Sequence, residues 1–227
     1  ISGYYGTEST FKPSKLLGFL LRVLFYTLLI PVVLSLFGVP ILADEAGIYG
    51  IAQYVFPIGN EHYWFMTAYF YLMLFMPLFN TAIKQLSGKQ FLVVVSCLLI
   101  VFCGVKSIIP VPLALDKGGY EFIWIVCVYL LAAWFKLHGG KVEAWIKKHC
   151  VKIYLGSCLL SWAMMLLFWK LSSVVGGLSY YFEIPLHHNF ILCLMGAIGL
   201  FYTFMSLNIK EGKIADIIRK VSVYSLG

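Results

Sequence analysis

The sequence contains few charged residues. Only 12% of its 227 residues are Asp, Glu, Lys or Arg, whereas 61% are hydrophobic and 17% are aromatic. Globular proteins average roughly 25% charged residues. A soluble domain of this size could not bury so much apolar surface, but a bilayer can accept it. The composition therefore excludes an ordinary soluble domain and predicts an integral membrane protein.

Metal-binding and disulfide motifs are also missing. The six cysteines form no CxxC pair, and no His or Cys spacing suits zinc. All except Cys150 fall inside apolar segments, so we interpret them as small core residues rather than disulfide partners. His187 and His188 are adjacent in one loop, but no further ligand accompanies them. We therefore expect no metal site.

The sequence is rich in apolar segments long enough to cross a bilayer. Six complete spans are expected, at residues 16–42, 64–83, 91–109, 121–137, 153–172 and 189–207. Pro31 and Pro40 are expected to bend the first. The start, Ile1-Ser2-Gly3-Tyr4, is typical of a helix that is ending, and residues 221–227 are typical of one that is beginning. The predicted fold class is all-α: a polytopic transmembrane helical bundle forming one domain, 1–227, truncated at both ends, with a partial span at each.

The basic residues predict the orientation in the membrane. The net charge of +7 is concentrated in loops 7–15, 84–90, 138–152 and 208–220. The intervening loops hold most of the acids, namely Asp44, Glu45, Glu61, Asp116, Glu121 and Glu183. The positive-inside rule places the basic loops in the cytoplasm. Segment 138–152 is also expected to form a short amphipathic helix along the interface. Because short loops account for the basic residues, we expect no nucleic-acid partner.

The stretch from Asn60 to Asn80 combines a polar cluster with the aromatic beginning of a span. A histidine can take a proton from an attacking hydroxyl and a carboxylate can orient it, so His62 and Glu61 are candidate catalytic residues. Trp64 and Tyr69 are candidate substrate contacts, because aromatic rings stack on the apolar faces of sugars. The alternative interpretation is a solvated loop pair before an interfacial aromatic belt.

This stretch resembles the acyltransferase-three family of bacterial integral-membrane O-acyltransferases. That family has an aromatic helix of the form Trp-Phe-x-x-x-Tyr with Pro and Asn at its end, matched here by Trp64, Phe65, Tyr69, Pro77 and Asn80. Three further segments are similar to family features: Ser2-Gly3-Tyr4 to the end of an early helix, Gly119 to Trp124 with Tyr129 to the entry of a later span, and Ser222 to Gly227 to the entry of the last helix. The resemblance covers essentially the whole chain.

The resemblance implies a multi-pass enzyme of the bacterial plasma membrane. Such an enzyme transfers an acyl group, usually acetyl from acetyl-CoA on the cytoplasmic side, to a hydroxyl of a cell-surface polysaccharide, a lipid-linked sugar or another acceptor. It implies no tightly bound cofactor, with acetyl-CoA or another acyl-CoA as the donor substrate and the bilayer and a glycan as partners. The family's main catalytic His lies upstream of the Ser-Gly-aromatic segment, so we expect it outside this sequence.

Arg22, Glu121 and Glu183 complete the candidate site residues. Arg22 matches one of two basic residues that the family places at the start of a helix, and the resemblance implies that it contacts donor phosphates. Phe19 stands one turn earlier, where the second would be. Glu121 and Glu183 lie at the outer ends of spans and are candidate acceptor contacts. A transporter or a catalytically inactive membrane subunit is the alternative function.

Overall fold

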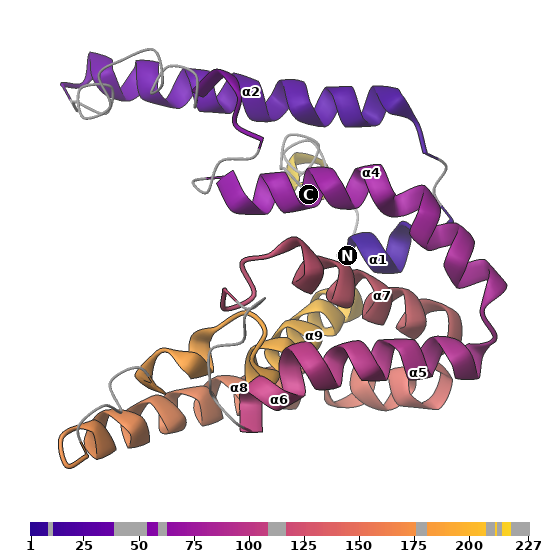
Figure 1. Cartoon of the computed structure of the whole chain (residues 1–227), viewed down its shortest axis with the longest axis vertical. Helices are drawn as coiled ribbons and strands as arrows, with labels where there is room; N and C mark the ends of the chain where they lie inside the picture. The colour runs from indigo at the N-terminus through magenta and orange to yellow at the C-terminus, as the bar shows by residue number, and fades with distance from the viewer. Residues whose placement is uncertain are drawn as a thin grey trace. The chain divides into compact units, whose positions relative to one another are not determined.

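The computed structural model describes residues 1–8, 11–38, 54–58, 63–108, 117–175, 181–207, 212 and 215–218. Over these residues the regular structure is helical and contains no strand, so the predicted all-α class is confirmed. Figure 1 shows the long helices. Five of them are long and apolar enough to cross a membrane: Pro13–Leu36, Trp64–Gln85, Gly88–Ile108, Gly140–Ser172 and Ile184–Ser206.

These helices match five of the six predicted spans. The remaining predicted span, 121–137, is the helix α7 (Phe122–His138), which has 17 residues and so lies at the short end of the spanning range of about 17–25 residues. The partial span expected at the beginning corresponds to the short helix α1 (Ser2–Tyr5). The partial span expected at residues 221–227 lies outside the described residues.

The chain divides into two compact units. Unit 1 comprises Ile1–Thr7, Leu86–Gly119 and Cys127–Gly227, and unit 2 comprises Glu8–Gln85 and Tyr120–Val126. Unit 2 contains α2 (Pro13–Leu36), α4 (Trp64–Gln85) and the first residues of α7. Unit 1 contains the other elements, in chain order α1, α5 (Gly88–Leu99), the π-helix η2 (Ile100–Gly104), α6 (Val105–Ile108), the rest of α7, α8 (Gly140–Ser172), the 3₁₀ helix η4 (Ile184–Leu186) and α9 (Ile191–Ser206).

In unit 2, α2 packs against α4. Phe19 on α2 lies with its ring centroid 5.4 Å from that of Tyr69 on α4. Pro31 is buried within α2, and the helix continues for five residues beyond it. The proline therefore does not end the helix, although it removes one backbone hydrogen-bond donor. The buried Thr27 hydroxyl lies within hydrogen-bond distance of the carbonyl oxygens of Leu24 (3.0 Å) and Tyr54 (3.1 Å). This contact attaches the segment around residue 54 to α2.

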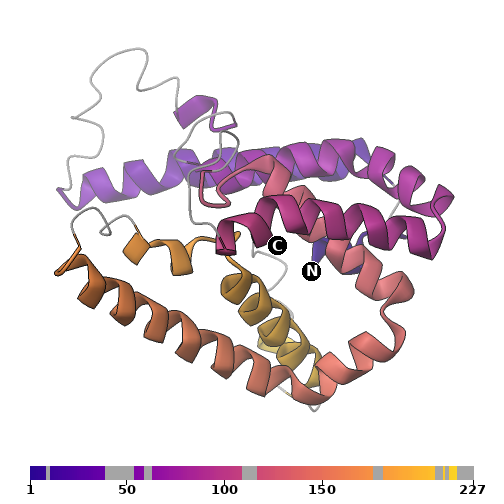
Figure 2. The ribbon, with the colours of Figure 1, turned by 60° about the horizontal axis from the view of Figure 1, so that its bottom comes forward.

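In unit 1, α8 and α9 are antiparallel and pack at very short range. A Cβ atom on Gly199 would lie 2.7 Å from the backbone nitrogen of Tyr154 and 2.8 Å from the carbonyl oxygen of Cys150. One turn earlier on α9, a Cβ on Gly196 would meet the side chain of Ser157 at 3.5 Å. Figure 2 shows α9 approaching the first half of α8. Small residues at such crossings let two membrane helices approach closely enough for backbone contact.

Two hydrogen bonds attach the beginning of α9 to the segments η2 and α6. A π-helix, η2, joins α5 to α6. The Asn189 side-chain amide donates to the Phe102 carbonyl of η2 at 3.1 Å, and the Ile191 backbone N–H donates to the Ser107 hydroxyl at 3.0 Å. Since the first N–H groups of a helix have no partners inside it, Ser107 supplies one of the missing acceptors.

The basic segment 138–152 does not form the separate interfacial helix predicted from the sequence. Residues from Gly140 onward are the first turns of α8, which runs without a break for 33 residues. The turn that separates α7 from α8 occurs at Gly139 and Gly140, and Gly140 has a φ of +43°, which favours glycine. No proline occurs between Gly140 and Ser172, so nothing ends the helix before its apolar part begins.

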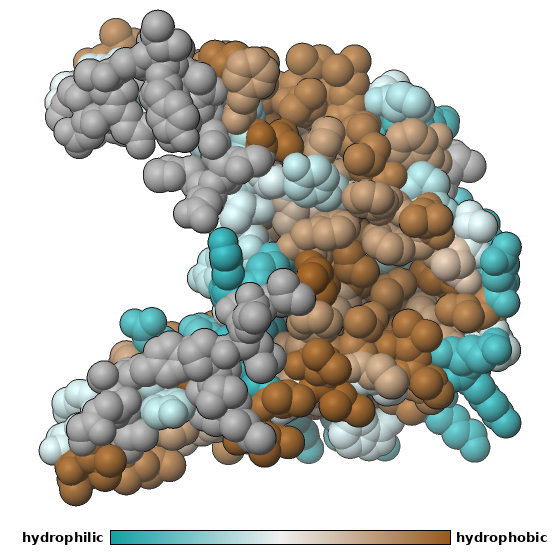
Figure 3. Space-filling model, viewed as in Figure 1, coloured by the Kyte–Doolittle hydropathy of each residue, from teal (hydrophilic) through white to brown (hydrophobic). Residues whose placement is uncertain are grey.

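The outer surfaces of the helices are strongly apolar. Figure 3 shows hydrophobic side chains over much of the visible face. On α8, for example, Leu159 and Trp162 are 70% and 71% exposed. An exposed apolar surface of this extent is costly in water but suits contact with lipid tails.

Candidate functional site

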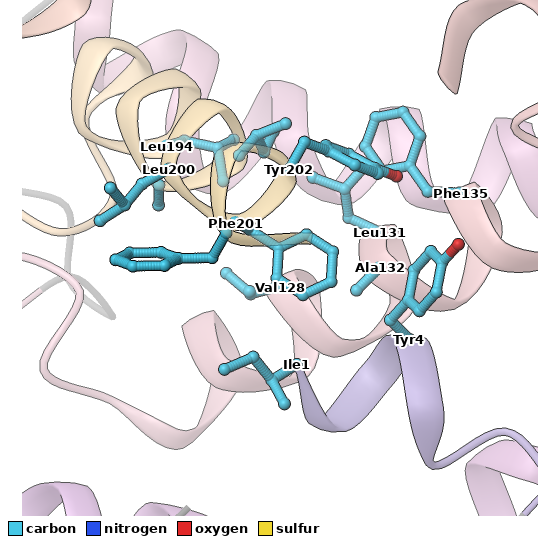
Figure 4. Close-up of a pocket in the computed structure, with 13 residues that line it drawn as sticks. Ile1, Tyr4, Val128, Leu131, Ala132, Phe135, Leu194, Leu200, Phe201 and Tyr202 are labelled. Atoms are coloured by element: carbon cyan, nitrogen blue, oxygen red, sulfur yellow. The ribbon is translucent and has the colours of Figure 1, made fainter. Parts of the chain in front are cut away.

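A cavity of about 470 Å³ lies in unit 1 between α1, α7 and α9. Its wall on α7 includes Val128, Leu131 and Ala132, and its wall on α9 includes Leu194 and Phe201. Figure 4 shows these side chains around the space. The volume falls within the range of small-molecule sites, roughly 300–1,000 Å³. We therefore treat this cavity as the first candidate site.

Gly3 explains how α1 reaches the cavity. A Cβ atom at this position would collide with the backbone carbonyl of Tyr129, so only glycine permits the close approach of α1 to α7. The next residue, Tyr4, is consequently buried, with 6% of its surface exposed. Its ring lies edge-on to those of Phe201 and Tyr202, at centroid distances of 5.5 and 6.4 Å. Such edge-to-face contacts are favourable for aromatic pairs.

One end of the cavity is polar. The Tyr4 hydroxyl donates a hydrogen bond to Oε1 of Glu143 at 2.8 Å, and Lys147 Nζ lies 2.9 Å from the same oxygen. Glu143 and Lys147 are one turn apart on α8, the spacing that brings opposite charges together on a helix. The carboxylate thus joins α1 to α8 and is stabilised by a phenol and an ammonium group.

Two lysine ammonium groups lie against aromatic rings that line the cavity. Lys136 Nζ is 5.1 Å from the ring centroid of Tyr4, and Lys147 Nζ is 5.7 Å from that of Tyr202. Both distances are within the range of cation–π attraction, about 6 Å. With Glu143 as the only acidic group in these contacts, the three charges sum to one positive charge. These charged groups contact the two tyrosines without lining the cavity, and both lysines are exposed.

Tyr202 is almost fully buried, with 1% of its surface exposed. Its hydroxyl interacts electrostatically with the Glu143 carboxylate, but among the described residues it has no hydrogen bond of good geometry. In Figure 4 the hydroxyl groups of Tyr4 and Tyr202 both lie toward Phe135, whereas Leu194 and Leu200 line the opposite, apolar end.

The predicted residues Arg22, Trp64 and Tyr69 all lie in unit 2. Trp64 is the first residue of α4 and is half-buried, and its ring centroid is 4.7 Å from that of Tyr120. Tyr69 is half-buried between the ring of Phe19 and that of Phe65, onto which it stacks with centroids 6.1 Å apart. Arg22 is exposed on α2. Both aromatic candidates therefore lie on α4, and each contacts an aromatic ring from another segment of unit 2.

Of the four predicted acidic and histidine site residues, the structure describes Glu121 and Glu183. Glu121 is half-buried directly before α7, next to Tyr120, and its backbone carbonyl accepts from Ile125 at 3.4 Å. Glu183 is exposed at the beginning of η4 in unit 1. Glu61 and His62 lie outside the described residues. Tyr63 follows them directly, and burial, with a smaller contribution from Tyr54, raises the pKa of its phenol.

A family model described as an acyltransferase domain, that of the acyltransferase-three family, matches residues 1–227. The chain belongs to this acyltransferase family. No curated protein and no solved structure matches it. The family and the five membrane-length helices together make the chain a multi-pass membrane acyltransferase. The resemblance inferred from the sequence is thereby confirmed.

Sequence reasoning missed the cluster of Tyr4, Glu143, Lys147 and Lys136 in this acyltransferase. Two signals were present in the sequence. Glu143 is the only acidic residue in the basic segment 138–152, and Lys147 follows it at the i,i+4 spacing. The contact with Tyr4 could not be found this way, because it joins residues separated by 139 positions.

Proposed function

We propose that this acyltransferase transfers an acyl group, typically acetyl from acetyl-CoA, to a hydroxyl of a cell-surface polysaccharide or another glycan, in the bacterial plasma membrane. The observation that carries the proposal is the match to the acyltransferase family along the entire sequence. In the reaction the acceptor oxygen bonds to the thioester carbonyl carbon and the carbon–sulfur bond breaks. The hydroxyl proton passes to a base and from the base to the departing thiolate, so that CoA leaves as the thiol.

The aromatic residues of unit 2 support a glycan acceptor. Trp64 and Tyr120 lie edge to face, at an interplanar angle of 67°, and the carboxyl-bearing Glu121 follows Tyr120. A sugar offers one apolar face and several hydroxyls. An aromatic ring suits the face and a carboxylate suits the hydroxyls. We propose that Trp64, Tyr69 and Glu121 contact the acceptor. Glu183, which lies in unit 1, is proposed separately as an acceptor contact.

The charge and exposure of Arg22 support the proposal that the donor is anionic, as acyl-CoA is. Its guanidinium is exposed on α2, near the cytoplasmic end that the positive-inside rule assigns to this helix. Arginine binds phosphate by paired hydrogen bonds that lysine cannot reproduce. We propose that Arg22 contacts the phosphates of acyl-CoA. His62, with Glu61 beside it, is proposed as the base nearest to the Trp64 platform in the sequence.

The test is an acyl-transfer assay on membranes from cells that express the protein. Membranes receive acetyl-CoA labelled in the acetyl group, and a panel of polysaccharide, lipid-linked sugar and peptidoglycan acceptors is screened for label. Membranes that lack the protein serve as the control. The expected result is acceptor-bound label that mild alkali releases, because an ester hydrolyses under conditions in which an amide survives. Alkali-stable label, or no label on any hydroxyl acceptor, would refute O-acyl transfer.

A further inference from the structure

The first part of α8 carries an exposed basic face. Four residues form this face, at the spacings i, i+4, i+7 and i+11 that place side chains on one side of a helix: Lys141, Trp145, Lys148 and Lys152. All four are exposed, and Trp145 is 57% exposed. On the opposite side of the helix Ile146 and Cys150 are buried, and the Cys150 carbonyl adjoins Gly199 of α9. The basic face is therefore directed away from α9.

Acidic residues do not offset the charge of the basic face. The one acidic residue of α8, Glu143, lies on another side of the helix and forms an ion pair with Lys147 at 2.9 Å. Within the part of the chain that the structure describes, Lys141, Lys148 and Lys152 form no ion pair. The basic face therefore presents three positive charges over about three turns of helix.

The length of α8 places the basic face at the edge of the bilayer. At 1.5 Å per residue, its 33 residues extend about 50 Å, whereas the hydrocarbon core of a bilayer is about 30 Å thick. Figure 2 shows α8 as one uninterrupted helix. Beyond Lys152 the same side of the helix continues in exposed apolar side chains, at Leu155, Leu159 and Leu166, which suit contact with lipid tails. The excess length therefore lies at the basic end.

The residues of the basic face match the chemistry of the headgroup layer. Lys152 lies at the boundary between the apolar and the basic part of α8, and Lys148 and Trp145 follow about one and two turns further out. Lysine side chains near a membrane boundary extend toward the headgroups, and tryptophan is enriched at that level. Basic residues directly beside a membrane span are attracted to anionic lipids.

We propose that the basic face of α8 binds the headgroups of acidic phospholipids. Each lysine near the surface contributes about fivefold to the preference for an anionic membrane. A zwitterionic headgroup balances its phosphate with its own cation and gains less. Continuity with the lipid-facing leucines favours a lipid over a soluble acidic protein as the partner. The proposal does not depend on the acyl-transfer reaction, because it rests on α8 alone.

Photolabelling of the purified protein in lipid nanodiscs tests the proposal. Two probes carry the same acyl chain, with a diazirine next to the glycerol ester, and differ only in the headgroup: phosphatidylglycerol and phosphatidylcholine. Each is added in the same small amount to nanodiscs of unlabelled phosphatidylcholine, and labelled peptides are mapped by mass spectrometry. Two or more lysines acting together should label residues 141–155 at least about tenfold more with phosphatidylglycerol. Equal labelling by both probes overturns the proposal and leaves the basic face to a soluble acidic partner.

Charge variants identify the side chains that are responsible. Replacing the three lysines of the basic face by glutamine should remove the preference for phosphatidylglycerol, whereas replacing them by arginine should preserve it. The matched control removes the same net charge at three exposed lysines elsewhere, by Lys84→Gln, Lys89→Gln and Lys170→Gln, and should leave the preference unchanged. If the control lowers the preference as much as the glutamine variant does, net charge rather than the basic face attracts the lipid, and the proposal is wrong.

Ionic strength provides a second measurement on the unmodified protein. The screening length falls from about 10 Å at 0.1 M salt to about 3 Å at 1 M. The preference for phosphatidylglycerol should therefore decrease several-fold in 1 M NaCl. Labelling by phosphatidylcholine, which reports the position of α8 in the bilayer, should stay constant. A preference that is equally strong at both salt concentrations would refute recognition by the lysine charges.

Discussion

Replacing Gly199 by alanine should destabilise the packing of α9 against α8. The added Cβ would lie 2.7 Å from the Tyr154 nitrogen and 2.8 Å from the Cys150 oxygen. Non-bonded heavy atoms prefer separations of about 3.5–4.0 Å, so the helices would have to separate by roughly 1 Å. Both neighbours are backbone atoms of a continuous helix, so no side chain can rotate away to relieve the contact.

The net effect follows from two opposing contributions. Overpacking of this kind costs typically 1–3 kcal/mol, and collision with backbone favours the upper part of that range. Alanine improves helix propensity over glycine by about 1 kcal/mol. We therefore expect a net loss of about 2 kcal/mol in the free energy of unfolding. For a protein of this size the loss corresponds to a decrease in Tm on the order of 5 °C.

The control is the same substitution at Gly156, which lies on α8. A Cβ there meets no atom within 4 Å, so Gly156→Ala should gain helix propensity without a collision and raise Tm by a few degrees. Thermal unfolding of both variants in one detergent, followed by circular dichroism, provides the comparison. The expected signs are opposite. If both substitutions shift Tm in the same direction by the same amount, the close approach at Gly199 has no energetic importance.

Three further predictions concern the site residues. Tyr4→Phe removes the hydrogen bond to Glu143 and should cost about 1.5–3 kcal/mol of unfolding free energy. The control Tyr5→Phe, at a side chain that is 59% exposed, should cost almost nothing. Equal Tm values for the two variants would contradict the stabilising role of the Tyr4 hydroxyl. Trp64→Ala should raise the acceptor KM about tenfold and Trp64→Phe much less, and a change confined to the KM for acyl-CoA would contradict acceptor stacking. Arg22→Gln should raise the KM for acyl-CoA about tenfold and leave that for the acceptor unchanged, and an unaltered donor KM would exclude phosphate contact.

The sequence was sufficient to predict the membrane helices but not all of their boundaries. Apolar length and composition identify a span because the bilayer requires about 20 apolar residues, whatever the neighbouring helices do. Boundaries depend on local backbone geometry instead. The basic, amphipathic composition of segment 138–152 predicts a separate interfacial helix. A helix, however, ends where backbone geometry stops it, and here the stop precedes the segment, at Gly139 and Gly140.

The candidate site was less predictable, because its contacts join distant parts of the sequence. Periodicity and spacing reveal neighbours on one helix, such as Glu143 and Lys147. They do not reveal that Tyr4 donates to Glu143 or that Lys136 lies over the ring of Tyr4. The aromatic candidates were easier to find, since Trp64 and Tyr69 lie on one helix whose beginning carries an unusual density of aromatic residues. Their partners Tyr120 and Phe19 required the structure.

The motifs that carry the family resemblance acquire physical reasons from the structure. In Ser2-Gly3-Tyr4, glycine is required because a side chain would collide with Tyr129, and the aromatic residue contributes to the wall of the cavity while its hydroxyl reaches Glu143. Gly119 has a φ of +85°, and a Cβ there would lie 2.8 Å from the backbone nitrogen of Asn189. Gly3 and Gly119 thus each permit a backbone contact between segments far apart in the sequence. These two motifs therefore record where segments of unit 1 meet, which is why they indicate the fold even though their residues need not touch a substrate.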